Sequence, residues 1–335
     1  MSFPDSVLGS PLLVVVEPAP EGRGGTKASK ELLSLARTLT TGEVCALYLG
    51  ADPDVSELAS LGADKVLSVA AGVGGFNARV PAACADAVTA ALEACPDLSG
   101  VLIPSTYVGR AAGTMVATAQ DLGIGIDVSG VQAQDGALVG LKSALQGSWK
   151  TSFTGDMPAI MAVRPGVGPA EGALVTPGKA TSAEPLTFGL SPAAKAVQVV
   201  SSTPQAKGER IPLTDADVVV VAGRGIDGDT ELVEGLADAL GAGIGATRVA
   251  CDEGWLPRAC QIGQTGLNIA PKVYLALGVS GAIHHVSGVL ASENILAIVD
   301  DPDAPILEIA DFAVVGDVAE VVPQLLEKLA AAGKD

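Results

Sequence analysis

Short apolar runs without a polar break recur along this chain, and they limit its possible folds more than any other feature. The clearest of them in the first half span residues 12–16, 44–49 and 100–104. Their β-branched composition is expected of strands buried on both faces of a parallel sheet. Helical patterns alternate with them at 27–39, 81–94 and 109–122. The alternation predicts a three-layer α/β domain, with helices on both faces of one sheet.

A second alternation of the same kind begins near residue 217. Strands are expected at 217–223 and near Thr247, Val273, Ile295 and Phe312. Helices are expected at 230–240 and 319–332, and the second of these carries its large apolar residues on one face. The pattern predicts a doubly wound, Rossmann-like α/β fold for this part of the chain.

The length and one polar stretch divide the chain into two predicted domains. A chain of 335 residues is too long for one ordinary core. Residues 176–194 are rich in Pro, Gly, Ser, Thr and Lys, which predicts an irregular crossing or linker rather than a core element. We therefore place the boundary near residue 205, with one domain at 1–205 and a smaller one at 206–335.

The charge of the chain narrows its possible partners. A formal net charge of −18 repels a phosphate backbone, and no basic run offsets it, so no nucleic-acid partner is expected. No segment reaches the roughly 20 consecutive apolar residues of a bilayer-spanning helix, so no membrane insertion is expected. The first residues lack the basic and apolar pattern of a secretion signal, which favours a cytoplasmic location.

Cysteines and aromatic residues set limits on the chemistry. The five cysteines, Cys45, Cys84, Cys95, Cys251 and Cys260, have no CxxC spacing, and small buried apolar side chains are their expected role. Aromatic residues make up only 3% of the chain. A flat cofactor would therefore be held mainly by hydrogen bonds, glycine backbone and charge.

A glycine-rich loop follows the first strand of the second half. Residues 223–228 read Gly-Arg-Gly-Ile-Asp-Gly, which matches the GxGxxG pattern of dinucleotide-binding loops. Asp227, Asp229 and Glu231 crowd the same turn and would repel a pyrophosphate. The alternative is that the glycines only permit a tight turn. In either case Arg224 could reach an anionic ligand beside the loop.

Two further polar clusters lie where strands end or begin. Thr247 and Arg248 fall near the carboxyl edge of the predicted sheet, which is the usual ligand edge in open α/β folds. Asp252 and Glu253 follow closely and could pair with that arginine. Residues 264–266 combine an amide, a hydroxyl and a glycine, a set suited to a heteroaromatic edge, although such clusters are also common turns.

Residues 273–290 join a hydrophobic strand to a Ser-Gly turn and then to His284 and His285. A strand, a tight turn and a polar helix start together favour a cofactor cradle. The two histidines are the only ones in the chain, and adjacent residues cannot share one helix face. Because no third ligand lies nearby, metal binding is not expected.

In order and spacing, these segments together with residues 301–306 resemble the alpha subunit of electron transfer flavoproteins. The likeness covers the whole C-terminal half, and the N-terminal half looks similar less distinctively, through residues 105–110. The resemblance implies FAD as cofactor and a beta subunit as partner in a heterodimer. It implies no catalytic or metal-binding residue, since such a protein tunes its flavin rather than cleaving bonds.

The resemblance also implies roles for individual residues. Arg248 would lie over the flavin ring, Thr265 near N5, and His285 near the pyrimidine carbonyl. An arginine and a histidine there would favour the negative charge added on reduction. The ribityl and pyrophosphate would be held by Gln264, Ser280 and the backbone of Gly281, Ala282 and Ile283, and the ADP portion by Arg224 and Asp317. The implied cofactor-binding residues further include Thr247, Ile262, Gly263, His284 and Val318.

The implied function is an electron carrier rather than an enzyme with its own substrate. It would take electrons from flavin dehydrogenases, such as the acyl-CoA dehydrogenases of fatty acid β-oxidation, and pass them to a quinone reductase or another acceptor. At two positions the chain departs from the family pattern: His284 replaces the usual glutamine and Val299 the usual asparagine. Two alternatives remain open, a non-redox interaction subunit and an NAD-dependent oxidoreductase that uses the glycine loop.

Overall fold

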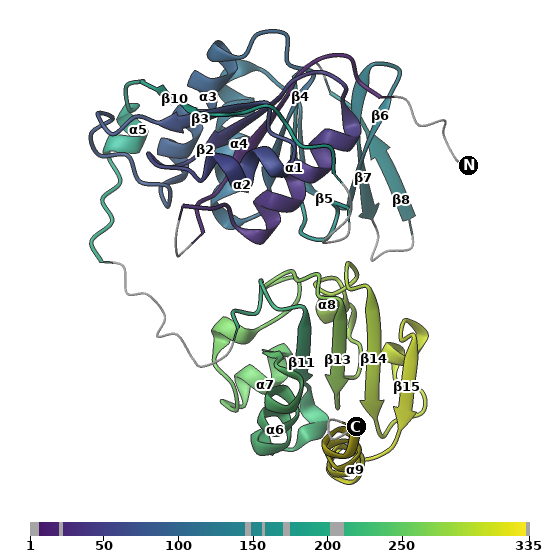
Figure 1. Ribbon diagram of the computed structural model, residues 1–335. Coiled ribbons are helices and arrows are strands. Elements are labelled where there is room, and N and C mark those ends of the chain that lie inside the picture. Colours follow the sequence, from purple (N-terminus) through teal and green to yellow (C-terminus); the bar gives the residue numbers. More distant parts are fainter. Residues whose placement is uncertain are drawn as a thin grey trace. The chain divides into compact units, whose positions relative to one another are not determined.

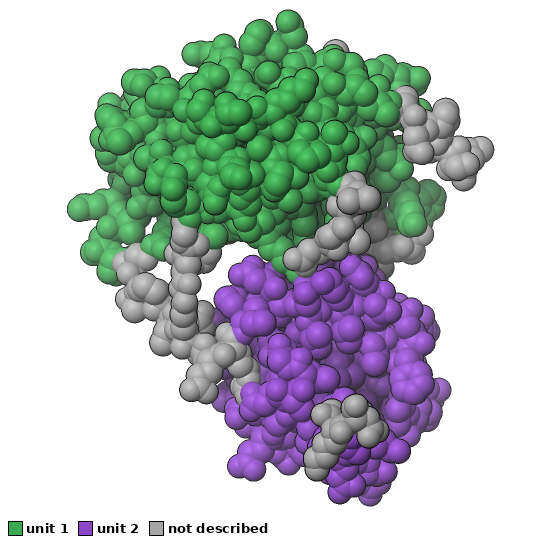
Figure 2. Space-filling view, in the orientation of Figure 1, with its two compact units in different colours: residues 1–202 green, residues 203–335 purple. Residues whose placement is uncertain are grey.

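The computed structural model describes residues 7–19, 23–144, 149–155, 158–169, 175–201 and 211–332. Contacts within the chain divide it into two compact units, Met1–Ser202 and Thr203–Asp335 (Figure 2). The predicted boundary near residue 205 lies outside the described residues. Among the described residues, no helix is long and apolar enough to cross a membrane.

The N-terminal unit is built on a seven-stranded parallel sheet with the strand order β10-β3-β2-β1-β4-β9-β5; β10, β3, β2, β4 and β5 are labelled in Figure 1. A separate antiparallel sheet contains β6, β7 and β8. The strands are β1 Leu12–Val16, β2 Val44–Tyr48, β3 Lys65–Val69, β4 Gly100–Pro104, β5 Ile124–Val128, β6 Gly130–Gln134, β7 Ala137–Ala144, β8 Trp149–Phe153, β9 Ala159–Val163 and β10 Ala183–Leu186. The helices are α1 Lys27–Leu39, α2 Val55–Ser60, α3 Pro81–Ala94, α4 Tyr107–Gln120 and α5 Pro192–Lys195.

Alternate side chains of the central strand enter two different cores. Leu12, Val14 and Val16 pack with α1 on one face of the sheet. Leu13 and Val15 pack with α3 and α4 on the other face. All five residues of β1 are buried, as expected of a parallel strand covered on both sides. The prediction of a three-layer α/β domain is confirmed.

The prediction that residues 176–194 form an irregular crossing or linker is wrong for part of this stretch, although residues 176–182 and 187–191 lie in neither a helix nor a strand. Within this stretch β10 pairs in parallel with β3, from Ala183 opposite Val66 to Leu186 opposite Val69, and α5 follows it. Pro185 lies in this strand, which is at the edge of the sheet, where a missing backbone N–H is tolerated. An edge strand has little need of a continuous apolar run, and this is why the pattern missed it.

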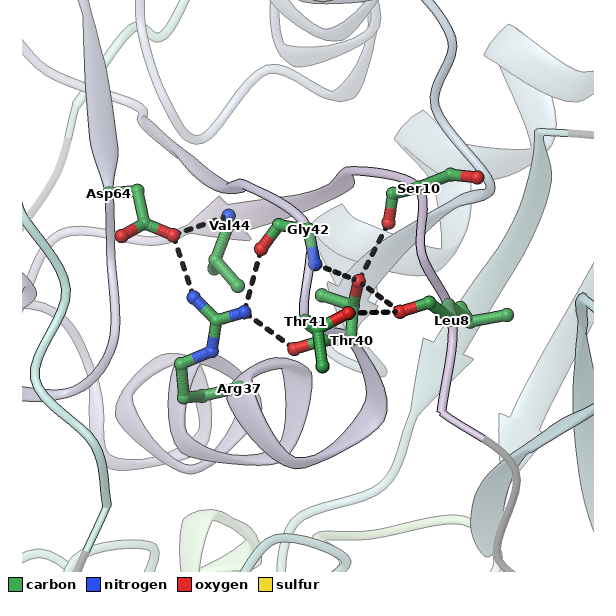
Figure 3. Close-up of polar contacts among 8 residues, drawn as sticks. All are labelled: Leu8, Ser10, Arg37, Thr40, Thr41, Gly42, Val44 and Asp64. Carbon is green, nitrogen blue, oxygen red and sulfur yellow. Dashed lines mark hydrogen bonds and ion pairs between the residues drawn. The ribbon is translucent and has the colours of Figure 1, made fainter.

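Arg37, in the last turn of α1, joins the end of that helix to the start of two strands (Figure 3). Its guanidinium donates to the carbonyl oxygens of Thr40 at 2.5 Å and Gly42 at 2.6 Å. It also pairs with Asp64 Oδ2 at 2.7 Å, and that oxygen accepts from the N–H of Val44 at 3.1 Å. A cation here satisfies two carbonyl oxygens of the turn that follows the helix, and it lies at the negative end of the helix dipole.

We expect Arg37→Ala to destabilise the N-terminal unit by about 3 kcal/mol, because it leaves a mostly buried carboxylate without its cation. The two side chains are only 12% and 14% exposed. Urea unfolding followed by circular dichroism measures the change. Arg23→Ala is the matched control, since the side chains of the Arg23–Asp52 pair are 61% and 73% exposed and such pairs contribute at most about 1 kcal/mol. Equal losses in the two variants would contradict this role of Arg37.

The C-terminal unit is built on a five-stranded parallel sheet with the order β12-β11-β13-β14-β15. Helices α6 and α9 and the short α7 pack on one face. The other face is covered by residues between Ile262 and Val289 and by η3. The strands are β11 Val218–Ala222, β12 Gly243–Ala246, β13 Val273–Leu277, β14 Asn294–Val299 and β15 Phe312–Val315. The helices are α6 Thr230–Leu240, α7 Arg248–Asp252, α8 Ile283–Val286 and α9 Val318–Ala332, with 3-10 turns η1 Arg224–Ile226, η2 Arg258–Cys260 and η3 Pro305–Glu308.

The cysteines and the left-handed residues complete the description of both units. Four cysteines are buried and Cys260 is half-buried, in agreement with a packing role for most of them. The Sγ atoms of Cys45 and Cys95 lie 2.8 Å apart. Within the described ranges, every non-glycine residue with a positive φ is an aspartate. These residues are Asp97, Asp121, Asp127, Asp135 and Asp227.

Candidate functional site

The predicted site residues lie along one edge of the C-terminal sheet. Because all five strands are parallel, the segments that follow them leave from the same edge. The order of the strands also reverses between β11 and β13, and ligands of open α/β sheets bind at such a switch point. Arg224 follows β11, Thr247 and Arg248 follow β12, Ser280 to His285 follow β13, and Asp317 and Val318 follow β15. Residues 262–265 join this edge because the N–H of Ile262 donates to Ala246 O at 2.9 Å.

The glycine loops after β11 and β13 contact each other directly. The N–H of Gly223 donates to Leu277 O at 2.8 Å, and that of Gly225 donates to Gly278 O at 3.0 Å. A Cβ atom on Gly223 would lie 2.1 Å from Gly278 O. The first two glycines of the GxGxxG pattern are therefore explained by loop packing, and their N–H groups are used within the protein. This arrangement gives no support to a dinucleotide-binding loop.

Arg248 stands at the start of α7 and points largely into solvent. The strand predicted near Thr247 is β12, which ends at Ala246, and Thr247 is the N-cap of α7, where its hydroxyl accepts from Ala250 N at 3.4 Å. The Arg248 side chain is 73% exposed, and its Nε lies 3.3 Å from Asp252 Oδ2. Of the two carboxylates that the sequence left open as partners, Asp252 pairs with Arg248. Enough of the guanidinium remains open to contact a ligand.

The segment 263–265 is held against the histidine pair. The N–H of Gln264 donates to His284 O at 2.7 Å, and its Oε1 lies 2.6 Å from His284 Nδ1. Gly263 has a φ of +128°, and a Cβ atom there would lie 2.4 Å from the same carbonyl oxygen. Only glycine allows this close approach. The two clusters, some twenty residues apart in sequence, thus form one exposed surface with Thr265 and His284 on it.

His285 is buried, unlike its neighbour. Its Nε2 lies 2.7 Å from the Tyr274 hydroxyl and its Nδ1 lies 3.2 Å from Ile262 O. Because a carbonyl only accepts, Nδ1 carries the proton and Nε2 accepts from Tyr274. Burial lowers the pKa of His285 to about 4, against the smaller opposite effect of the bond to Ile262 O. Both ring nitrogens have protein partners, so this arrangement does not support the expected contact of His285 with the flavin carbonyl.

The turn after β13 is fixed by a neighbouring loop. The N–H of Ile306 donates to Ser280 O at 3.1 Å. Gly281 has a φ of +83°, and a Cβ atom there would lie 2.3 Å from the same nitrogen. Ser280 and Ala282 remain exposed. The expected helix after this turn is a single turn of four residues, α8, so its contribution is a short set of backbone groups rather than a long helix dipole.

The residues expected at the ADP end differ in exposure. Arg224 is exposed in η1, and Asp317 is exposed before α9, where its Oδ1 accepts from Ala319 N at 2.8 Å. Val318 and Ile262 are both buried, each in one of the two cores of this unit. Their side chains therefore cannot contact a ligand at the surface, and only their backbone can take part.

Arg258 and Gln261 lie beside the site, and neither was predicted from the sequence. Arg258 pairs with Asp252 and donates to the side chain of Gln261, which in turn donates to Thr265. Gln261 is buried. Its position, three residues before the polar cluster at 264–266, was the only available signal, and burial is not visible in a single sequence.

Known proteins match this chain over both of its units. The family model described as the electron transfer flavoprotein domain matches residues 15–204, and the one described as the electron transfer flavoprotein FAD-binding domain matches residues 212–290. The electron transfer flavoprotein subunit alpha of Mycobacterium leprae is 38% identical over 316 residues, which cover 91% of this chain and 94% of the relative. The electron transfer flavoprotein subunit alpha of Mycobacterium tuberculosis is 39% identical over 331 residues, which cover 96% of this chain and 98% of the relative. That of Syntrophomonas wolfei is 36% identical over 314 residues, covering 90% and 94%.

The chain belongs to the electron transfer flavoprotein alpha subunit family. The prediction made from the sequence is confirmed, and with it FAD as the cofactor of the family's C-terminal domain. FAD carries an anionic pyrophosphate and a ring with several acceptor atoms. The exposed groups along the edge suit it: two arginines and the polar side chains of Gln264, Thr265, Ser280 and His284. In this alpha subunit the residues present therefore fit the cofactor.

The buried histidine of this alpha subunit should make its stability depend on pH. In the unfolded chain His285 takes up a proton below about pH 6.5, whereas the folded ring, with its pKa lowered to about 4, does not. Stability should therefore fall as the pH is lowered through this window, with a contribution of at most about 1.4 kcal/mol per pH unit. Urea unfolding between pH 5 and 7.5, above the pI of about 4.4, measures the slope.

His285→Gln should flatten this pH dependence. His284→Gln is the matched control, because that ring is exposed, and it should keep the wild-type slope. The same slope in all three proteins would contradict the assigned state of His285.

Proposed function

We propose that this chain, as the alpha subunit of an electron transfer flavoprotein, pairs with a beta subunit and carries electrons between other proteins on its FAD. It takes electrons from flavin dehydrogenases, among them those of the acyl-CoA type in fatty acid β-oxidation, and delivers them to a quinone reductase or another acceptor. Residues 206–335 would hold FAD, and residues 1–205 would contact the beta subunit. The cytoplasmic location expected from the sequence stays a prediction.

One observation carries the proposal: exposed cationic and neutral hydrogen-bond donors share the carboxyl edge of the sheet, at the point where the order of the strands reverses. We place Arg248 and Thr265 at the flavin ring. His284 replaces His285 as the exposed ring of the pair. The backbone of residues 281–283 and Arg224 would serve the pyrophosphate and the ADP portion. FAD supplies the electron chemistry, and the protein binds it, orients it and adjusts its potential.

No contact among the described residues favours the two alternatives. The N–H groups of Gly223 and Gly225 are bonded within the protein, which leaves NAD without its usual cradle. Val299, which stands where the family pattern has asparagine, is 4% exposed and lies in a core of the C-terminal unit. An apolar side chain is well suited to that position.

The first experiment is the visible spectrum of the chain co-expressed with a beta subunit, with the released chromophore identified after denaturation. We expect FAD at about one per alpha chain. A well-folded, colourless heterodimer that takes up no added FAD would contradict the proposed function. A flavin-loaded chain that gains nothing from any beta subunit would contradict the heterodimer alone.

We expect Arg248→Ala to retain FAD and to lower the potential of its first reduction, because a cation beside the ring stabilises the added negative charge. A reductive titration against a reference dye measures the shift. Arg23→Ala removes the same charge from another exposed arginine that pairs with an aspartate, in the N-terminal unit, and should leave the potential unchanged. A wild-type potential in Arg248→Ala would remove Arg248 from the ring.

A further inference from the structure

A chain of four polar contacts connects Arg248 to Thr265. Arg248 Nε lies 3.3 Å from Asp252 Oδ2, and the other oxygen of that carboxylate pairs with Arg258 Nη2. Arg258 Nη1 donates to Gln261 Oε1 at 2.8 Å, and Gln261 Nε2 donates to Thr265 Oγ1 at 2.9 Å. Both ends are residues that the proposed function places at the flavin ring. The three residues between them, Asp252, Arg258 and Gln261, have no assigned role.

The direction of each hydrogen bond in this chain follows from the chemistry of its groups. A guanidinium has five N–H donors and no acceptor, so the group that faces it must be an oxygen. The Gln261 amide therefore presents Oε1 to Arg258 and its NH₂ group to Thr265. The threonine oxygen accepts that bond, and its own hydrogen is then directed away from the amide. Arg258 thus sets Thr265 as a hydrogen-bond donor toward its exposed side.

Gln261 is held firmly enough to transmit this direction. It is 3% exposed, its N–H donates to Arg258 O at 3.1 Å, and its carbonyl oxygen accepts from Leu267 N at 2.8 Å. The side-chain amide has one low-energy orientation. If it were rotated by half a turn, its NH₂ group would face the N–H donors of Arg258, and a buried hydrogen bond would be lost. The orientation of the amide is therefore decided by the N–H donors of Arg258.

Asp252 connects the second arginine to the first. Its carboxylate is shared by Arg248 and Arg258, so the three groups together carry one positive charge. The Arg258 and Asp252 side chains are 67% and 38% exposed, and ion pairs this exposed contribute little to stability. Variants of these residues should therefore fold, and the role of the contacts is to hold the arginine side chains in place.

We infer that Asp252, Arg258 and Gln261 are positioning residues of the FAD site: Arg258 orients the Thr265 hydroxyl as a donor through Gln261 and holds Arg248 through Asp252. The inference rests on the proposed function, which supplies the ligand of Thr265 and Arg248. A ring nitrogen that gains electron density on reduction is stabilised by a donor placed beforehand. The three residues act through their neighbours and need not touch FAD.

Gln261→Glu tests the direction of the bonds with little change of shape. The new carboxylate still pairs with Arg258 but can only accept, so the threonine hydroxyl turns to donate inward and is lost to the ligand. We expect FAD to stay bound and its potential, measured by reductive titration of the full heterodimer, to fall. Thr265→Val, which has no hydroxyl, should lower the potential in the same direction.

The added negative charge would itself lower the potential, and a double-mutant cycle separates this effect from that of orientation. A direct effect of charge is independent of residue 265, whereas an effect through the hydroxyl disappears once valine stands there. We expect Gln261→Glu to shift the potential clearly less in the Thr265→Val background than in the wild type. Equal shifts in the two backgrounds would overturn the inference.

Arg258→Met gives an independent test that avoids the buried position. It should retain FAD and a wild-type melting temperature and lower the potential, again with a smaller shift in the Thr265→Val background. Arg23→Met is the matched control, because it removes an equally exposed arginine from an aspartate pair, and it should change nothing. Arg258→Met with a wild-type potential would overturn the inference even if Gln261→Glu fails to fold. A wild-type heterodimer without flavin absorbance would instead contradict the proposed function, and this assignment with it.

Discussion

Parallel strand pairing in the C-terminal sheet is the constraint on which the candidate site depends. It brings the carboxyl ends of all five strands to one edge, so segments far apart in sequence begin their loops beside one another. The bond from Ile262 N to Ala246 O adds a segment that leaves no strand of its own. Because of this pairing, polar residues spread over nearly a hundred positions of the sequence lie along one edge of the sheet.

Much of this arrangement could be predicted from the sequence, because buried parallel strands need continuous apolar runs. The runs at β1, β4 and β13 and the amphipathic patterns of α1, α3 and α6 agree with the structure to within a residue or two. The same reasoning failed where an element is only partly buried. The edge strand β10 contains Pro185, and β8 is mostly exposed. Neither has a run long enough to be recognised.

Side-chain direction was the other limit. Sequence reasoning required His284 and His285 to differ in orientation, yet it could not tell which of them faces inward. The choice is made by Tyr274 of β13, whose side chain lies in the core on the same face of the sheet and whose hydroxyl bonds the buried ring. Gln261 and Arg258 escaped notice for the same reason: the value of each lies in a bond to a residue several positions away. The GxGxxG loop shows the opposite problem. Its sequence matches a dinucleotide-binding pattern, but its first two glycines are needed because the loop packs closely against Gly278 of the neighbouring loop.

The aspartates with positive φ change how the acidity of this chain should be understood. Asp121 ends α4 and Asp227 ends η1, each in the left-handed conformation that a short polar side chain tolerates better than most. Part of the net charge of −18 is therefore carried by residues that also form turns. Charge-reversal scans of the acidic surface would confuse backbone geometry with electrostatics at these positions, and asparagine, which accepts the same conformation, is the substitution that separates the two.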